Sequence, residues 1–132
     1  MENQLICLGS LILGQNGIWG DLPAISPEGR ARFGTVLGKY RQVRDDVARA
    51  FPIVEGALAG NPEIHEKIAE NGRGAVVVFA PYGWHRYVTA ARPNRKVWHT
   101  EGTQVSFDDA GHAVIQSTVP KSGAQIIFFG TE

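Results

Sequence analysis

Gly74-Ala75-Val76-Val77-Val78-Phe79-Ala80 is the segment with the strongest strand character in this chain of 132 residues. Three consecutive valines and a phenylalanine favour extended backbone, because β-branched and aromatic side chains pack well on a pleated surface. Asn71-Gly72 before the segment and Pro81-Tyr82-Gly83 after it are typical of turns. The pattern therefore predicts a β-strand over residues 74–80.

Short strand-like segments continue on both sides of this strand and are separated by turn residues. They are residues 63–68, 84–90, 96–100, 103–107, 112–118 and 124–129. Short strands at nearly regular spacing are typical of an antiparallel sandwich. The segment 63–68 is charged, and we expect Glu63, Glu66 and Lys67 to form a solvated strand or edge. Strand alternation would place Glu63 and Glu66 on opposite faces, which argues against an acid/base pair.

One long amphipathic helix is expected before these strands. Ser26-Pro27-Glu28 is typical of a helix start, and Pro52 ends a helix that should run to about Ala50. Apolar residues at three- and four-residue spacing predict one buried face, made of Phe33, Val36, Leu37, Tyr40, Val43, Val47 and Phe51. Gly34 and Gly38 suggest that the helix backbone lies close to another element.

The region before the helix is an apolar run followed by a glycine-rich loop. Leu5–Leu13 is compatible with a strand buried on both faces or with a short buried helix, and periodicity does not decide between them. In the loop at residues 15–22, two glycines turn the backbone sharply and hold Trp19 and Asp21 close together. Strand, glycine-rich loop and helix is how a βα unit brings side chains to the ligand face of an α/β barrel, and the sequence contains one such unit.

These elements predict a mainly β fold: an antiparallel β-sandwich preceded by an apolar strand or short helix and one long amphipathic helix. We place a boundary near Pro52. Residues 1–52 then form an N-terminal α/β fragment that resembles the last βα unit of a barrel, and residues 53–132 form the sandwich domain.

The charge and cysteine content exclude several functional classes. Thirteen basic and thirteen acidic residues give zero net charge, so nothing global attracts the chain to nucleic acid or an anionic membrane. Cys7 is the single cysteine and cannot form an internal disulfide, so we expect a cytoplasmic protein. The run Leu5–Leu13 is too short to span a bilayer. The four histidines lack the paired spacing of a metal site, and we expect no metal and no cofactor.

Three segments occur in a particular order along the N-terminal half. They are Gly14-Gln15-Asn16-Gly17-Ile18-Trp19-Gly20-Asp21-Leu22, Ser26-Pro27-Glu28 and Leu37-Gly38-Lys39-Tyr40-Arg41-Gln42-Val43-Arg44. Together they resemble the C-terminal portion of melibiase-type α-galactosidases and related retaining glycoside hydrolases. In that family the last strand of a catalytic barrel leads into a similar loop and helix, and an antiparallel C-terminal β-sandwich follows.

The resemblance implies glycosidase ancestry without glycosidase activity in this chain alone. Retaining hydrolysis needs two carboxyl groups about 5 Å apart, and the family carries them on earlier barrel strands. Asp21 matches a loop position and neither of those carboxylates. We therefore expect a non-catalytic accessory domain, with weak or no carbohydrate binding. The alternatives are a fragment of an active glycosidase whose barrel is missing here, a stand-alone hydrolase or isomerase, and an oligomeric interaction module.

Two clusters of aromatic and polar residues are candidate carbohydrate contacts, because an aromatic face stacks on a pyranose while amides and carboxylates bind its hydroxyls. The candidates are Asn16, Trp19 and Asp21 in the first cluster, and Tyr82, Trp84 and His85 in the second. For each cluster the alternative is packing within the protein, which we favour for the first cluster and for each residue of the second taken alone. Trp84 is equally compatible with a place in the sandwich core.

A homo-oligomer is also expected from the apolar surfaces. Leu5–Leu13 and the apolar face of the 26–51 helix would pack on a barrel in the family. Without a barrel they would expose a patch large enough to drive association, so we predict a dimer that buries both.

Overall fold

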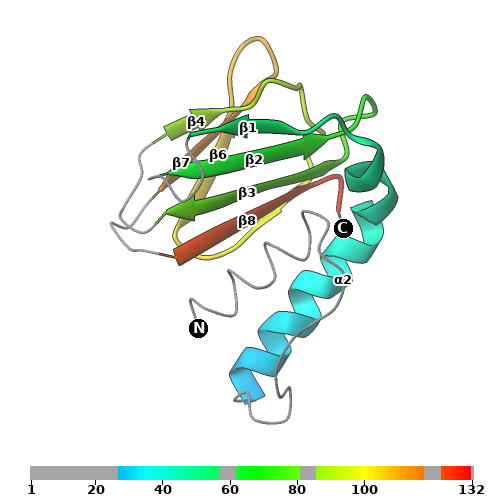
Figure 1. Ribbon diagram of the computed structural model, residues 1–132, viewed down its shortest axis with the longest axis vertical. Helices are drawn as coiled ribbons and strands as arrows, with labels where there is room; N and C mark the ends of the chain where they lie inside the picture. Colours follow the sequence, from blue (N-terminus) through cyan, green and yellow to red (C-terminus); the bar gives the residue numbers. More distant parts are fainter. Residues whose placement is uncertain (1–26, 57–61, 81–85, 118–122, 132) are drawn as a thin grey trace.

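The computed structural model describes residues 27–56, 62–80, 86–117 and 123–131 (Figure 1). These residues form one long helix, α2 (Pro27–Arg49), followed by a series of short strands. The strands are β1 (Ile53–Glu55), β2 (Glu63–Ile68), β3 (Gly74–Ala80), β4 (Arg86–Val88), β5 (Val97–His99), β6 (Thr103–Phe107), β7 (Ala113–Ser117) and β8 (Gly123–Phe129). The apolar run Leu5–Leu13 lies outside the described residues.

The strands form two antiparallel sheets. One sheet has five strands in the order β1-β2-β3-β8-β5, and the other has three in the order β4-β7-β6. Every pairing between neighbouring strands is antiparallel. The prediction of a mainly β, antiparallel sandwich with one long helix is therefore confirmed.

The five-stranded sheet is covered on both faces. Helix α2 packs on one face, where it contacts β2, β3 and β8, and the three-stranded sheet packs on the other (Figure 1). Strand β3 shows this alternation, because Ala75 and Val77 belong to the helix-side core whereas Val76 and Val78 belong to the core between the sheets. The run of valines thus forms a strand buried on both sides, as apolar runs in central strands do.

Most of the predicted apolar face of the helix is buried on the chain's own sheet. Val36, Val43 and Val47 are buried there, and Leu37 and Tyr40 pack partly against the same core. The prediction that this helix face forms part of a dimer interface is therefore wrong, because β3 and β8 already cover it.

Two other expectations for the helix are also wrong. Phe51 is 83% exposed and lies beyond the helix end at Arg49. The predicted close approach at Gly34 and Gly38 is absent from the part of the chain that the structure describes. Both glycines are exposed, and a Cβ at either would meet no atom within 4 Å.

Gly38→Ala is expected to raise the free energy of unfolding by up to about 1 kcal/mol, because alanine has the higher helix propensity and the site is open. Gly72→Ala is a comparison variant that should change the stability in the opposite direction. Gly72 has φ +83°, and its Cβ would lie 2.9 Å from the Asn94 backbone nitrogen, so this variant should lose about 1–3 kcal/mol. Urea denaturation of both variants measures the two effects. A destabilised Gly38→Ala variant would mean that this helix face is covered after all.

Candidate functional site

The six residues predicted to contact carbohydrate lie outside the described residues. They are Asn16, Trp19, Asp21, Tyr82, Trp84 and His85. Their role remains a prediction. Of their neighbours, Arg86 is exposed at the start of β4, and Tyr87 is only 5% exposed in the core between the sheets.

Glu66 is a buried carboxylate between the two sheets. It comes from β2, is 1% exposed, and accepts three hydrogen bonds. The Tyr87 hydroxyl donates to its Oε1 at 2.7 Å and the Ala90 backbone N–H to the same oxygen at 2.8 Å, while the Ala91 N–H donates to Oε2 at 3.0 Å. Glu66 thereby connects the five-stranded sheet to β4 and the loop that follows it.

The expectation of a solvated strand at residues 63–68 is wrong. β2 pairs with both β1 and β3, so it is an interior strand, and Glu63 is only 8% exposed. The predicted separation of the two glutamates is correct. Glu63 pairs across from Phe79, which packs against the helix-side core, whereas Glu66 lies between the sheets.

Burial raises the pKa of the Tyr87 phenol far above its ordinary range, and the hydrogen bond to the Glu66 carboxylate adds to this effect. A phenol held in its protonated form is a permanent hydrogen-bond donor to Glu66. This pair therefore acts as a structural bridge between the two sheets.

Glu63 and His65 form a second polar pair on the helix-side face of β2. His65 Nε2 lies 3.6 Å from Glu63 Oε1, and the imidazole packs edge-on against Phe79 with ring centroids 5.9 Å apart. The His65 side chain is 22% exposed, so it is held mainly by packing against Phe79 within the fold. A distance of 3.6 Å is too long for a good hydrogen bond.

The end of helix α2 carries a third polar cluster, centred on Asp46, which is 6% exposed. Arg49 Nη2 donates to Asp46 Oδ1 at 2.9 Å, Asn71 Nδ2 donates to the same oxygen at 2.8 Å, and Arg73 Nε donates to Oδ2 at 3.1 Å. Arg73 continues the cluster by donating from Nη1 to the Gly130 carbonyl at 2.8 Å and from Nη2 to the Gln42 carbonyl at 2.6 Å. One guanidinium thus joins the helix, the β2–β3 turn and the end of β8.

Burial acts to raise the pKa of the Asp46 carboxyl, but the hydrogen bonds from Asn71, Arg73 and Arg49 outweigh it and hold the pKa below its ordinary value. The folded protein therefore binds fewer protons at this site than the unfolded chain. The resulting stability is fully present above about pH 4, the usual pKa of an unfolded aspartate, and is lost as the pH falls through the folded-state value.

Asp46→Asn removes this titration, so the stability gap between wild type and the variant should narrow as the pH drops below about 4. Urea midpoints of both proteins, measured between neutral pH and about pH 2.5, test the prediction. A gap that stays constant across that range would mean that Asp46 is not held as a carboxylate by its partners.

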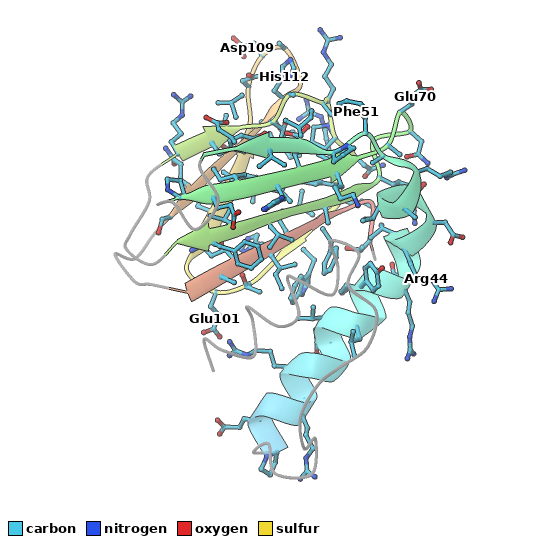
Figure 2. All side chains as sticks on the ribbon, in the orientation of Figure 1. Arg44, Phe51, Glu70, Glu101, Asp109 and His112 are labelled. Carbon is cyan, nitrogen blue, oxygen red and sulfur yellow. The ribbon has the colours of Figure 1, made fainter. Side chains whose placement is uncertain are left out.

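A cleft lies beside the Asp46 cluster, between the end of α2 and the β2–β3 turn. Its volume is about 470 Å³, and its lining residues are Arg49, Ala50, Phe51, Ile68, Ala69, Glu70 and Asn71. Phe51 and Glu70 lie at the same end of the molecule (Figure 2). The volume falls in the range of small-molecule sites, about 300–1,000 Å³.

Local sequence signals build both walls of this cleft. The helix ends at Arg49, and Ala50 N–H still donates to the Asp46 carbonyl at 3.0 Å. Pro52 disfavours helical backbone at the residue before it, so Phe51 leaves the helical period and with it the core. On the opposite wall the Gly72 N–H donates to the Ala69 carbonyl at 2.9 Å and closes the turn that carries Glu70 and Asn71. In the sequence, Pro52 already indicated that the helix ends before residue 51. The apolar spacing nevertheless placed Phe51 on the buried face.

Chemically, the cleft combines an exposed aromatic ring with a guanidinium, a carboxylate and an amide. Such a set binds polar ligands with an apolar face and does not by itself supply a nucleophile with a base. Among the residues that the structure describes, no three His, Cys, Asp or Glu side chains are grouped so as to hold a metal ion. No helix in the described ranges has the length and apolarity needed to cross a membrane.

Comparison with known proteins found no matching family model, no matching curated protein and no matching solved structure.

Proposed function

We propose that this chain is a non-catalytic accessory domain related to the glycoside hydrolases, with weak binding of carbohydrate. The observation that carries the proposal is the order of elements: a long helix, then directly an antiparallel sandwich of two sheets. The same order follows from the resemblance of the N-terminal segments to the C-terminal portion of melibiase-type α-galactosidases. The helix packs on the five-stranded sheet, so the helix and the sandwich share one apolar core.

The burial and hydrogen bonding of two carboxylates support a non-catalytic role. Glu66 and Asp46 each accept three hydrogen bonds from groups within the fold. A carboxylate that attacks or protonates a glycoside must reach the substrate, and these two are almost completely buried. Glu63 and Glu66 lie on opposite faces of β2, so they do not flank one scissile bond.

We expect no hydrolysis of 4-nitrophenyl α-galactoside above the buffer background. The assay uses the purified full chain alongside Asp21→Asn and Glu63→Gln variants. Turnover that persists through further purification and is abolished in either variant would overturn the non-catalytic proposal, because a contaminating glycosidase would be unaffected by these substitutions. The alternative of a fragment of an active glycosidase predicts that activity appears only when a catalytic barrel is supplied.

The proposal extends to a cytoplasmic homodimer. The single Cys7 favours a reducing compartment, and the apolar sequence of Leu5–Leu13 favours self-association. The apolar face of α2 is buried on the chain's own sheet, so the proposed dimer depends on the run at residues 5–13 alone. Light scattering during size-exclusion chromatography tests it, and a stable monomer at micromolar concentration would contradict it.

A further inference from the structure

We infer that the cleft between the end of α2 and the β2–β3 turn is a binding site for a neutral pyranose, with Phe51 as the stacking surface and Arg49 and Glu70 as hydroxyl ligands. The inference rests on the proposed function, because it assigns a place to the carbohydrate binding proposed there. It moves that binding to residues that the carbohydrate motifs of the sequence did not include.

Phe51 has the exposure that a stacking platform requires. It is 83% exposed, whereas the other exposed large hydrophobic residues in the described ranges are the smaller Val54 and Val88. Leaving a phenylalanine in water forgoes the favourable free energy of burying its ring. The fold gains little packing from this ring, and its exposed face is therefore open to a ligand in the cleft. The electron-rich face of a phenyl ring also attracts the positively polarised C–H groups of a pyranose ring.

Arg49 and Glu70 provide complementary hydrogen-bonding groups at the rim. The Arg49 side chain is 70% exposed and is anchored through Nη2 to Asp46, while a guanidinium has five N–H donors in all. Glu70 is exposed on the turn and carries an acceptor-only carboxylate. Sugar hydroxyls both donate and accept, so adjacent hydroxyls can use the two groups together.

The mixture of charges selects against other ligands. An anion would meet the Glu70 carboxylate and a cation the Arg49 guanidinium, so a ligand without net charge is favoured. The walls are held in place before binding, because Asn71 donates to Asp46 and accepts from the Arg73 N–H at 2.9 Å. A preorganised wall lowers the entropy cost of binding. A small cleft with one aromatic ring predicts a Kd on the order of millimolar.

The test is a titration of the ¹⁵N-labelled full chain with methyl α-D-galactopyranoside and, separately, methyl α-D-glucopyranoside, followed by amide chemical shifts. Saturable shifts are expected at residues 49–51 and 68–71. Phe51→Ala should weaken binding at least about tenfold, equivalent to about 1.4 kcal/mol. Val54→Ala is the matched control, since it truncates an exposed apolar side chain that does not line the cleft, and its affinity should be unchanged.

The remaining outcomes separate the inference from the proposed function. Saturable binding with shifts elsewhere, and with normal affinity in a folded Phe51→Ala variant, would overturn the cleft assignment and leave carbohydrate binding in place. No shift with either sugar at tens of millimolar would overturn both the cleft and the carbohydrate part of the proposed function. Equal losses in Phe51→Ala and Val54→Ala would also overturn the assignment, because the effect would then not be specific to the cleft.

Discussion

Glu66→Ala is expected to lower the free energy of unfolding by about 3–5 kcal/mol. The substitution leaves three buried donors, the Tyr87 hydroxyl and the backbone N–H groups of Ala90 and Ala91, without their acceptor. It also leaves a cavity between the sheets where a fully buried side chain stood. Urea denaturation followed by circular dichroism measures the loss. A marginally stable domain of this size should be partly unfolded at 37 °C with this change.

A double-mutant cycle isolates the contribution of the tyrosine. Tyr87→Phe removes one donor and keeps the ring, so it should cost about 1–2 kcal/mol in the wild-type background. In the Glu66→Ala background the same change should cost little or nothing, because the hydroxyl has already lost its acceptor. Additive losses in the double variant would show that the 2.7 Å contact contributes nothing of its own. Thr35→Ala, on the exposed face of α2, is a control that should change stability by less than about 0.5 kcal/mol.

Arg73→Ala is expected to cost about 2–4 kcal/mol. The variant loses the donor to Asp46 Oδ2 and leaves the carbonyls of Gly130 and Gln42 without their side-chain partner. Asp46 keeps Asn71 and Arg49, so its charge is not left alone in a buried site. The consequence is a looser attachment of α2 to the sheet, which amide hydrogen exchange in residues 42–50 should report as faster exchange.

Arg73→Lys distinguishes geometry from charge. A lysine ammonium keeps the positive charge but cannot reproduce the fork that reaches Asp46, Gln42 and Gly130 at once, so most of the loss should remain. Arg44→Ala on the same helix is the matched control, because Arg44 is exposed, and its expected change is within about 0.5 kcal/mol. Full recovery of stability in Arg73→Lys would show that the charge near Asp46 is sufficient and that the two carbonyl contacts are unimportant.

Local sequence signals were sufficient for the start of the helix and for the described strands other than β1 (Ile53–Glu55), which was not predicted. The strands at 74–80 and 103–107 have the predicted bounds, and α2 begins at Pro27 as its capping residues indicate. These elements depend on propensity and turn chemistry within a few residues of each other. The prediction was wrong about the burial of the charged strand at residues 63–68. Charged side chains indicate exposure to solvent, and the sequence does not show which groups will hydrogen-bond to them when they are buried.

The buried polar clusters around Glu66 and Asp46 depend on contacts between residues that are distant in sequence. The donors to Glu66 come from residues 21 to 25 positions away, and Arg73 meets Asp46 across 27 positions. No periodicity encodes such pairings, since they arise only when two sheets and a helix are assembled. Phe51 is a different case, because its helical spacing and the following Pro52 gave opposite indications, and the local effect of the proline was the stronger one.

The position of β8 in the sheet has a consequence for the order in which this protein is made and folded. β8 (Gly123–Phe129) is last among the described strands, yet it lies between β3 and β5 and pairs with both. The valine strand therefore has an unpaired edge during synthesis. Until residues 123–129 are made, the helix-side core lacks Ile126 and Phe128, and the core between the sheets lacks Ile127 and Phe129. Until residues 123–129 join the sheet, this apolar edge of β3 stays open to pairing with another chain, which is the situation that favours aggregation.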